Sequence, residues 1–81
     1  MIKGNKKILH FNLIFRPEAE GGFTVLVPAL PGCVSYGETL VEAKEMIHDA
    51  IEGYVASAKK NGEKIMSDEE SFMTTLDFSY V

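Results

Sequence analysis

Apolar and polar residues alternate in three stretches in the first half of the chain. The first stretch, Lys7 to Arg16, places on one face the apolar residues Leu9, Phe11, Leu13 and Phe15. The second runs from Phe23 to Pro28 and the third from Cys33 to Tyr36. A two-residue period of this kind is typical of β-strands. The sequence therefore predicts three strands, joined as an antiparallel meander.

Turn-forming residues separate the predicted strands. Pro17 ends the first strand, and the loop 18–22 closes with two glycines that tolerate positive φ. A proline-glycine turn then stops the second strand and reverses the chain. The residues that we assign to this turn and to the start of the following helix are Pro28, Pro31, Gly32, Gly37 and Thr39. Their predicted role is structural.

The apolar positions change to a helical period after Thr39. One face of a helix from Leu40 to Lys60 would carry Leu40, Ala43, Met46, Ile47, Ala50, Ile51, Tyr54, Val55 and Ala58. This set spans about half of the helix circumference, which is enough to cover one side of a small sheet. Thr39 and Glu42 form a capping box at its start. Gly62 is a natural residue to follow its end.

Strand-like alternation returns from Ser71 to Val81. One face of this segment carries Phe72, Thr74, Leu76, Phe78 and Tyr80, and the other Met73, Thr75, Asp77, Ser79 and Val81. The sequence therefore predicts a fourth, C-terminal strand. The predicted fold is α+β, a single domain over residues 1–81, in which one long helix packs on the sheet in the order βββαβ.

One helix covers only one side of a sheet, yet the other side is not uniformly polar. Ile8 and Ile14 lie on the second face of the first predicted strand, and Leu26 lies there on the second. Sheets with one solvated face are mostly polar on that face. We therefore expect a second chain to pack here, in a homo-oligomer that is a dimer or a tetramer. A plain monomer stays the alternative, because isolated apolar residues are common on surfaces.

Composition and charge narrow the function classes. A chain of 81 residues holds one core, and its net charge of −4 argues against non-specific nucleic-acid binding. The single Cys33 excludes an internal disulfide and suits a reducing compartment. No apolar run reaches the ~18–20 residues of a membrane span, and no signal peptide follows the basic start Met1 to Lys7. We expect a cytoplasmic protein that binds neither membrane nor nucleic acid directly.

Few residues are candidates for chemistry. Four acids on the helix, Glu42, Glu45, Asp49 and Glu52, form a ridge opposite the apolar face. This ridge is either an ordinary solvated face or a docking surface for a basic protein. His10, His48 and Cys33 lack the spacing of metal sites or of nucleophile–base pairs. The sequence therefore predicts no catalytic residue, no metal site and no cofactor.

The block from Phe23 to Gly62 resembles the HicB antitoxin family. The residues that carry the resemblance are Phe23-Thr24-Val25, Pro28, Leu30-Pro31-Gly32-Cys33, Ser35-Tyr36-Gly37-Glu38-Thr39, Glu42-Ala43, Ala50-Ile51, Tyr54 and Asn61-Gly62-Glu63. The resemblance implies a partly degraded ribonuclease-H-like sheet. It also implies an antitoxin of a type II toxin–antitoxin pair, which binds a small, basic, mRNA-cleaving HicA-type toxin and inhibits it sterically.

Two other function classes stay open. The first is a free-standing oligomeric interaction domain of the same fold with an unrelated partner. The second is a small enzyme, which the sequence disfavours because the predicted strands offer only Asp77 to a metal-dependent nuclease site. Longer family members carry a C-terminal DNA-binding domain, whereas this chain stops at Val81. We therefore do not expect direct operator binding.

Overall fold

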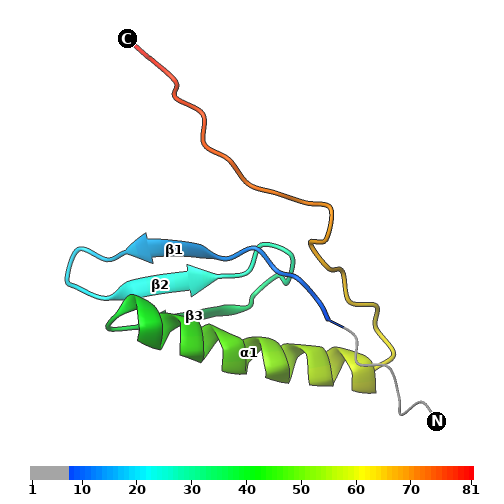
Figure 1. Cartoon of the computed structure of the whole chain (residues 1–81). Helices are drawn as coiled ribbons and strands as arrows, with labels where there is room; N and C mark the ends of the chain where they lie inside the picture. Colours follow the sequence, from blue (N-terminus) through cyan, green and yellow to red (C-terminus); the bar gives the residue numbers. More distant parts are fainter. Residues whose placement is uncertain (1–7) are drawn as a thin grey trace.

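The computed structural model describes residues 8–81, with three strands and one helix (Figure 1). The strands β1 (Ile14–Pro17), β2 (Phe23–Leu26) and β3 (Val34–Gly37) pair antiparallel in the order β1-β2-β3. The helix α1 (Leu40–Lys60) follows and lies across one face of this sheet. The predicted α+β class, the meander and the helix are thereby confirmed.

Strand β1 is shorter than the sequence predicts. The expected strand begins at Lys7, which lies outside the described residues, whereas pairing begins at Ile14, opposite Leu26. Continuing this register would set Asn12 against Pro28, which has no N–H to donate. The turn after β2 therefore ends the pairing, and residues 8–13 run on without a partner strand.

The core lies between the sheet and α1. Its buried side chains are Val25, Val27, Leu30, Cys33, Ala43 and Ile47. The inward-facing pair Phe15 and Val25 shares one register position, and Val25 is fully buried. Residues 11 and 13 also pack against this cluster, although they belong to no strand. The predicted inward face of the first stretch is therefore confirmed, while its strand pairing is confirmed only from Ile14 onward.

Local capping explains why α1 has the predicted bounds. The hydroxyl of Thr39 accepts the N–H of Glu42 at 3.0 Å, and the Glu42 carboxylate accepts the N–H of Glu38 at 2.6 Å. At the other end the N–H of Glu63 reaches the carbonyl of Ala58, at 2.8 Å. Gly62, just before Glu63, has a φ of 73°, and the Schellman motif requires such a positive φ at this position. Both helix ends are thus fixed by short-range signals.

The predicted apolar face of α1 is only partly covered. Ala43, Ile47 and Ala58 are buried, whereas Leu40 and Met46 are 51% and 47% exposed. Three strands spaced by about 4.8 Å span roughly 10 Å between the two edge strands. A sheet of this width covers the middle of the helix face and leaves its flanks to solvent. The apolar face of the helix is therefore wider than the sheet that it covers.

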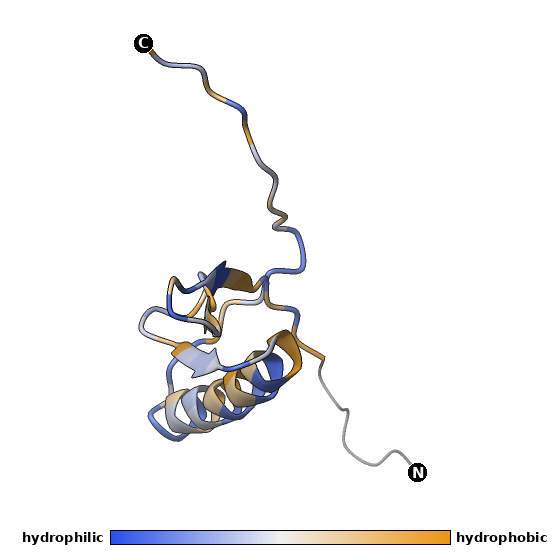
Figure 2. Ribbon diagram, turned by 90° about the vertical axis from the view of Figure 1, so that its left-hand side faces the viewer, coloured by the Kyte–Doolittle hydropathy of each residue, from blue (hydrophilic) through white to orange (hydrophobic). Residues whose placement is uncertain are grey.

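The predicted fourth strand is not formed in the described chain. The backbone N–H of Asp68 donates to the carbonyl of His10 at 2.7 Å, and the Asp68 carboxylate accepts the N–H of Asn12 at 2.8 Å. Beyond this anchor every residue from Glu69 to Val81 is exposed and the chain is extended. A strand needs a paired edge, and this segment, the arm (residues 71–81), points away from the sheet (Figures 1 and 2).

The arm gives the molecule its elongated shape. The principal extents are 61 × 28 × 25 Å, and the radius of gyration is 15.7 Å. A compact domain of this length would have a radius of gyration of about 12 Å.

Candidate functional site

The face of the sheet opposite α1 carries an uncovered apolar row. The register aligns Ile14, Leu26 and Val34 across all three strands. Ile14 and Leu26 are half-buried, and Val34 is 52% exposed. The helix packs on the other side of the sheet, as Figure 1 shows. This apolar row is the feature that the sequence predicts from Ile14 and Leu26, and the register extends it to Val34.

Carboxylates gather at one end of the same face. Glu18, Glu20 and Glu38 line a hollow of about 690 Å³ together with the ring of Tyr36. The Tyr36 hydroxyl donates to the carbonyl of Gly21 at 2.9 Å, which holds the ring across the β1–β2 loop. Partial burial, followed by the negative charges of Glu38 and Glu18, raises the pKa of Tyr36. We call this group the acidic hollow, and it adjoins the apolar row.

Sequence reasoning missed the acidic hollow. Glu18 and Glu20 lie in the loop after β1, and Glu38 lies between β3 and α1. Only the antiparallel pairing brings these two connections to the same end of the sheet. The available signal was the meander itself, because it predicts that the loop after the first strand and the end of the third lie together.

The helix ridge has a less uniform charge than its sequence suggests. Glu42, Glu45, Asp49 and Glu52 are all exposed. Glu42 is already engaged in the helix cap through Glu38. Lys44 and His48 share a shallow depression with Glu45 and Asp49, so a cation lies among the acids. The ridge therefore presents a mixed surface. The lining of the acidic hollow holds three carboxylates and no cation, while Arg16 lies beside it, in register with Thr24 of that lining.

One part of the ridge brings metal-ligand types together. Ligand atoms of His48, Asp49 and Glu52 lie within 4.8 Å of one another, and the His48 Nδ1 lies 3.9 Å from the Asp49 carboxylate. All three side chains are exposed and come from a single stretch of α1. Protein metal sites usually enclose the ion with ligands from more than one element. Nothing in this geometry distinguishes the group from an ordinary helix surface.

Cys33 and His10 lie in different environments, and neither has the surroundings of a catalytic residue. Cys33 belongs to the core, with 5% of its surface exposed, and burial raises the pKa of its thiol. A reactive cysteine needs the opposite shift, toward the thiolate. His10 is exposed and uses its backbone to bind Ser67 and Asp68. The arrangement of these groups is structural.

The predicted turn residues lie in the turn between β2 and β3 and at the junction of β3 with α1. Pro28 and Pro31 flank the turn between β2 and β3, and Gly32 has a φ of 84°. Gly37 ends β3 against the first turn of α1, so close that an added Cβ would collide with the backbone of Ala43. Thr39 caps that helix. These residues set the geometry that places Tyr36 and Glu38 beside each other.

Comparison with known proteins identifies the family of this fold. The sequence model of the family described as HicB-like antitoxin of bacterial toxin–antitoxin system matches residues 11–79. This range includes most of the arm. The chain belongs to the HicB-like antitoxin family. The resemblance of residues 23–62 is thereby confirmed and extends over nearly the whole chain. Among residues 8–81, no helix is both long and apolar enough to cross a membrane.

Individual relatives share much of the chain. The UPF0150 protein Ta0767 of Thermoplasma acidophilum is 39% identical over 66 residues, which cover 82% of this chain and 96% of the relative. The UPF0150 protein ssl0259 of Synechocystis is 34% identical and covers 75% of this chain and 84% of the relative. A UPF0150 protein of Helicobacter pylori is 31% identical, with 75% and 85% covered. The printed names of these relatives state no activity.

Proposed function

We propose that this HicB-like protein is the antitoxin of a type II toxin–antitoxin pair and sterically inhibits a small, basic, HicA-type ribonuclease. Family membership supports an antitoxin role. The net charge of −4 favours a basic partner over nucleic acid. In this proposal the chain has no enzymatic activity and acts in the cytoplasm as a homo-oligomer.

The observation that carries the docking surface is the apolar row beside the acidic hollow. Protein interfaces derive affinity from a desolvated apolar centre and association rate from charges at the rim. Ile14, Leu26 and Val34 supply such a centre on the uncovered side of the sheet. Glu18, Glu20 and Glu38 supply a rim of the sign that attracts a basic ribonuclease. The helix ridge offers charge with less apolar surface, and it is the competing docking surface.

The family fold adds a reason for inhibition without catalysis. We infer that the three strands and α1 represent a partly degraded ribonuclease-H-like sheet. Nuclease sites of that kind hold metal ions with several carboxylates on strands. The three strands β1, β2 and β3 contain no Asp or Glu. The chain is therefore suited to covering a toxin rather than to cleaving RNA.

The experiment compares two exposed valines on opposite sides of the molecule. Val34 belongs to the apolar row, and Val41 is 70% exposed on α1, beside Glu45 and Asp49. Val34→Arg should weaken inhibition of RNA cleavage by a purified HicA-type ribonuclease at least ~10-fold, because a buried unpaired charge faces a basic partner. Val41→Arg should leave inhibition unchanged.

Two results would overturn this assignment. If Val41→Arg weakens inhibition and Val34→Arg does not, the toxin docks on the helix ridge instead. If the wild-type chain does not inhibit the basic protein at all, the antitoxin role itself fails for this pair, and an interaction domain with an unrelated partner becomes the better account. Circular dichroism of both variants checks that each retains its helix.

A further inference from the structure

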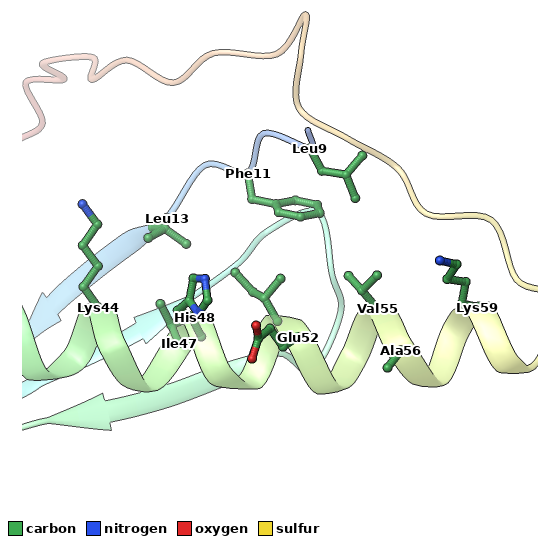
Figure 3. Close-up of a pocket in the computed structure, with 11 residues that line it drawn as sticks. Leu9, Phe11, Leu13, Lys44, Ile47, His48, Glu52, Val55, Ala56 and Lys59 are labelled. Carbon is green, nitrogen blue, oxygen red and sulfur yellow. The ribbon is translucent and has the colours of Figure 1, made fainter. Parts of the chain in front are cut away.

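An apolar groove runs between the N-terminal segment and α1, on the β1 side of the sheet. Its apolar lining is Leu9, Phe11, Leu13, Ile47, Ile51 and Val55, and its volume is about 660 Å³. Figure 3 shows that Leu9, Phe11 and Leu13 point toward the helix across this space. The groove lies beside β1, which is an edge strand that no other strand of residues 8–81 pairs on its outer side. A strand added there would form backbone hydrogen bonds with β1 and would pack its side chains on the apolar lining of the groove.

The arm has the complementary character. Phe72, Leu76, Phe78 and Tyr80 lie on one face of it and are between 81% and 87% exposed. Soluble proteins seldom expose a contiguous apolar surface of this kind without a partner. Residues of the arm do not line the groove of their own chain, and the chain beyond α1 passes outside it (Figure 3). Among residues 8–81, an uncovered apolar groove therefore occurs together with an exposed apolar arm.

We propose that the arm of one chain lies in the groove of a second copy, so that two chains exchange arms. This inference deepens the proposed homo-oligomer and rests on it. The exchanged arm pairs as a strand with the free edge of β1 and turns its aromatic face onto the groove. Each chain both donates and receives an arm, which gives the closed two-fold symmetry of most protein dimers.

The local geometry favours exchange over folding back. The N–H of Ser71 donates to the carbonyl of Asp68 at 3.1 Å, and this turn follows the anchor of Asp68 on His10. After this turn the chain leaves the packed sheet and helix and stays extended to Val81. No glycine or proline occurs between Glu63 and Val81 to reverse the chain a second time. An arm held in this way reaches a neighbouring molecule more readily than its own groove.

The length of the groove and the apolar area of the arm fit the same occupant. Lys44 and Lys59 border the groove and are separated by about 22 Å along the helix axis. The extended span from Phe72 to Tyr80 is about 27 Å. Two arms would bury six aromatic side chains at about 150–250 Å² each, which approaches the area of a stable interface.

The first test compares neighbouring arm residues on opposite faces, in the absence of any toxin. Light scattering should give the wild-type chain a mass twice 9.0 kDa. Leu76→Glu should lower the mass to that of one chain, whereas Thr75→Glu should leave it doubled. Both side chains are exposed in the single chain, so neither substitution disturbs its fold. A wild-type monomer at tens of micromolar, or equal loss in both variants, would overturn the proposal.

The second test separates exchange from folding back. Ala56 lines the groove, and Thr74 lies on the arm face that turns onto the groove, so Ala56→Cys and Thr74→Cys add thiols at little cost. The native Cys33 is buried and reacts slowly. A short bismaleimide should link a mixture of the two single variants into a covalent dimer. Linkage only within chains that carry both substitutions would show that the arm folds back, and would overturn exchange.

This outcome is independent of toxin binding. Failure of both tests, with full inhibition of the basic ribonuclease by the wild-type chain, would remove the arm exchange and leave the proposed antitoxin function. If the arm becomes protected from proteolysis only when the toxin is added, the toxin and not a second copy covers it, and the proposal is wrong.

Discussion

Single residues of small volume decide how closely the helix approaches the sheet. Gly37 ends β3 directly under Ala43, and Ala43 is fully buried. This contact brings the capped start of α1 against the end of β3, so that Glu38 lies beside Tyr36. The acidic hollow therefore depends on a residue that carries no charge and no side chain.

Replacing this glycine tests the contact. Gly37→Ala should lower the free energy of unfolding by about 1–3 kcal/mol, because its Cβ collides with the backbone of Ala43. Gly53→Ala is the matched control, since a Cβ on Gly53 meets nothing within 4 Å and alanine favours the helix by about 0.5–1 kcal/mol. Urea unfolding followed by circular dichroism measures both. Equal stabilities for the two variants would refute the close approach.

The buried thiol makes stability depend on alkaline pH. Burial raises the pKa of Cys33 in the folded chain above its ordinary value of 9.0. As the pH rises past that value, the unfolded chain loses its thiol proton first. The folded state then binds more protons, so the free energy of unfolding falls with rising pH until the folded pKa is passed.

The Cys33→Ala variant isolates this effect from other groups. We expect the wild-type chain to lose more stability than the variant between about pH 7 and about pH 10, where a free thiol ionises. The difference between the two urea midpoints at each pH measures it. A constant difference over this range would show that the thiol does not lose its proton more readily on unfolding.

Elements that depend on short-range signals could be predicted, and those that depend on partners could not. The bounds Leu40–Lys60 follow from Thr39, Glu42 and Gly62, all within a few residues of the helix ends. The first strand was predicted too long because its length depends on the turn at Pro28, far along the chain. The alternation of the arm predicts a strand that the described chain does not form, because a strand needs a paired edge and the arm is unpaired.

The two charged surfaces, the helix ridge and the acidic hollow, also differ in how far the sequence predicts them. The helix ridge can be found by counting along one element, whereas the acidic hollow requires the pairing of three strands. We expect the double change Glu20→Lys with Glu38→Lys to slow association with the basic ribonuclease about 10-fold at low salt. The same charge change on the ridge, Glu45→Lys with Asp49→Lys, should slow it less, because Lys44 already lies among those acids.

Stopped-flow mixing at two salt concentrations measures these rates. The deficit of the hollow variant should shrink as salt screens the charges. A larger deficit for the ridge variant would move the docking surface to α1. All four replaced side chains are exposed, so urea unfolding should show little change in stability.

At the scale of the whole molecule, two uncovered surfaces point in different directions. The apolar row with the acidic hollow occupies the outer face of the sheet, and the groove lies beside β1 over α1. An arm exchange uses the groove and leaves the outer face open. A dimer built in this way presents two outer faces, each of which can cover one toxin. Assembly and inhibition would then be separate functions of separate surfaces.

The central claim is that this HicB-like chain neutralises a small basic ribonuclease by binding it. The most direct measurement is a titration of RNA cleavage by a purified HicA-type ribonuclease against increasing amounts of this chain. We predict a linear fall in cleavage that reaches zero near one chain per toxin, without degradation of RNA by the chain itself. Cleavage that stays constant across an excess of the chain, with the toxin fully active, would contradict the account.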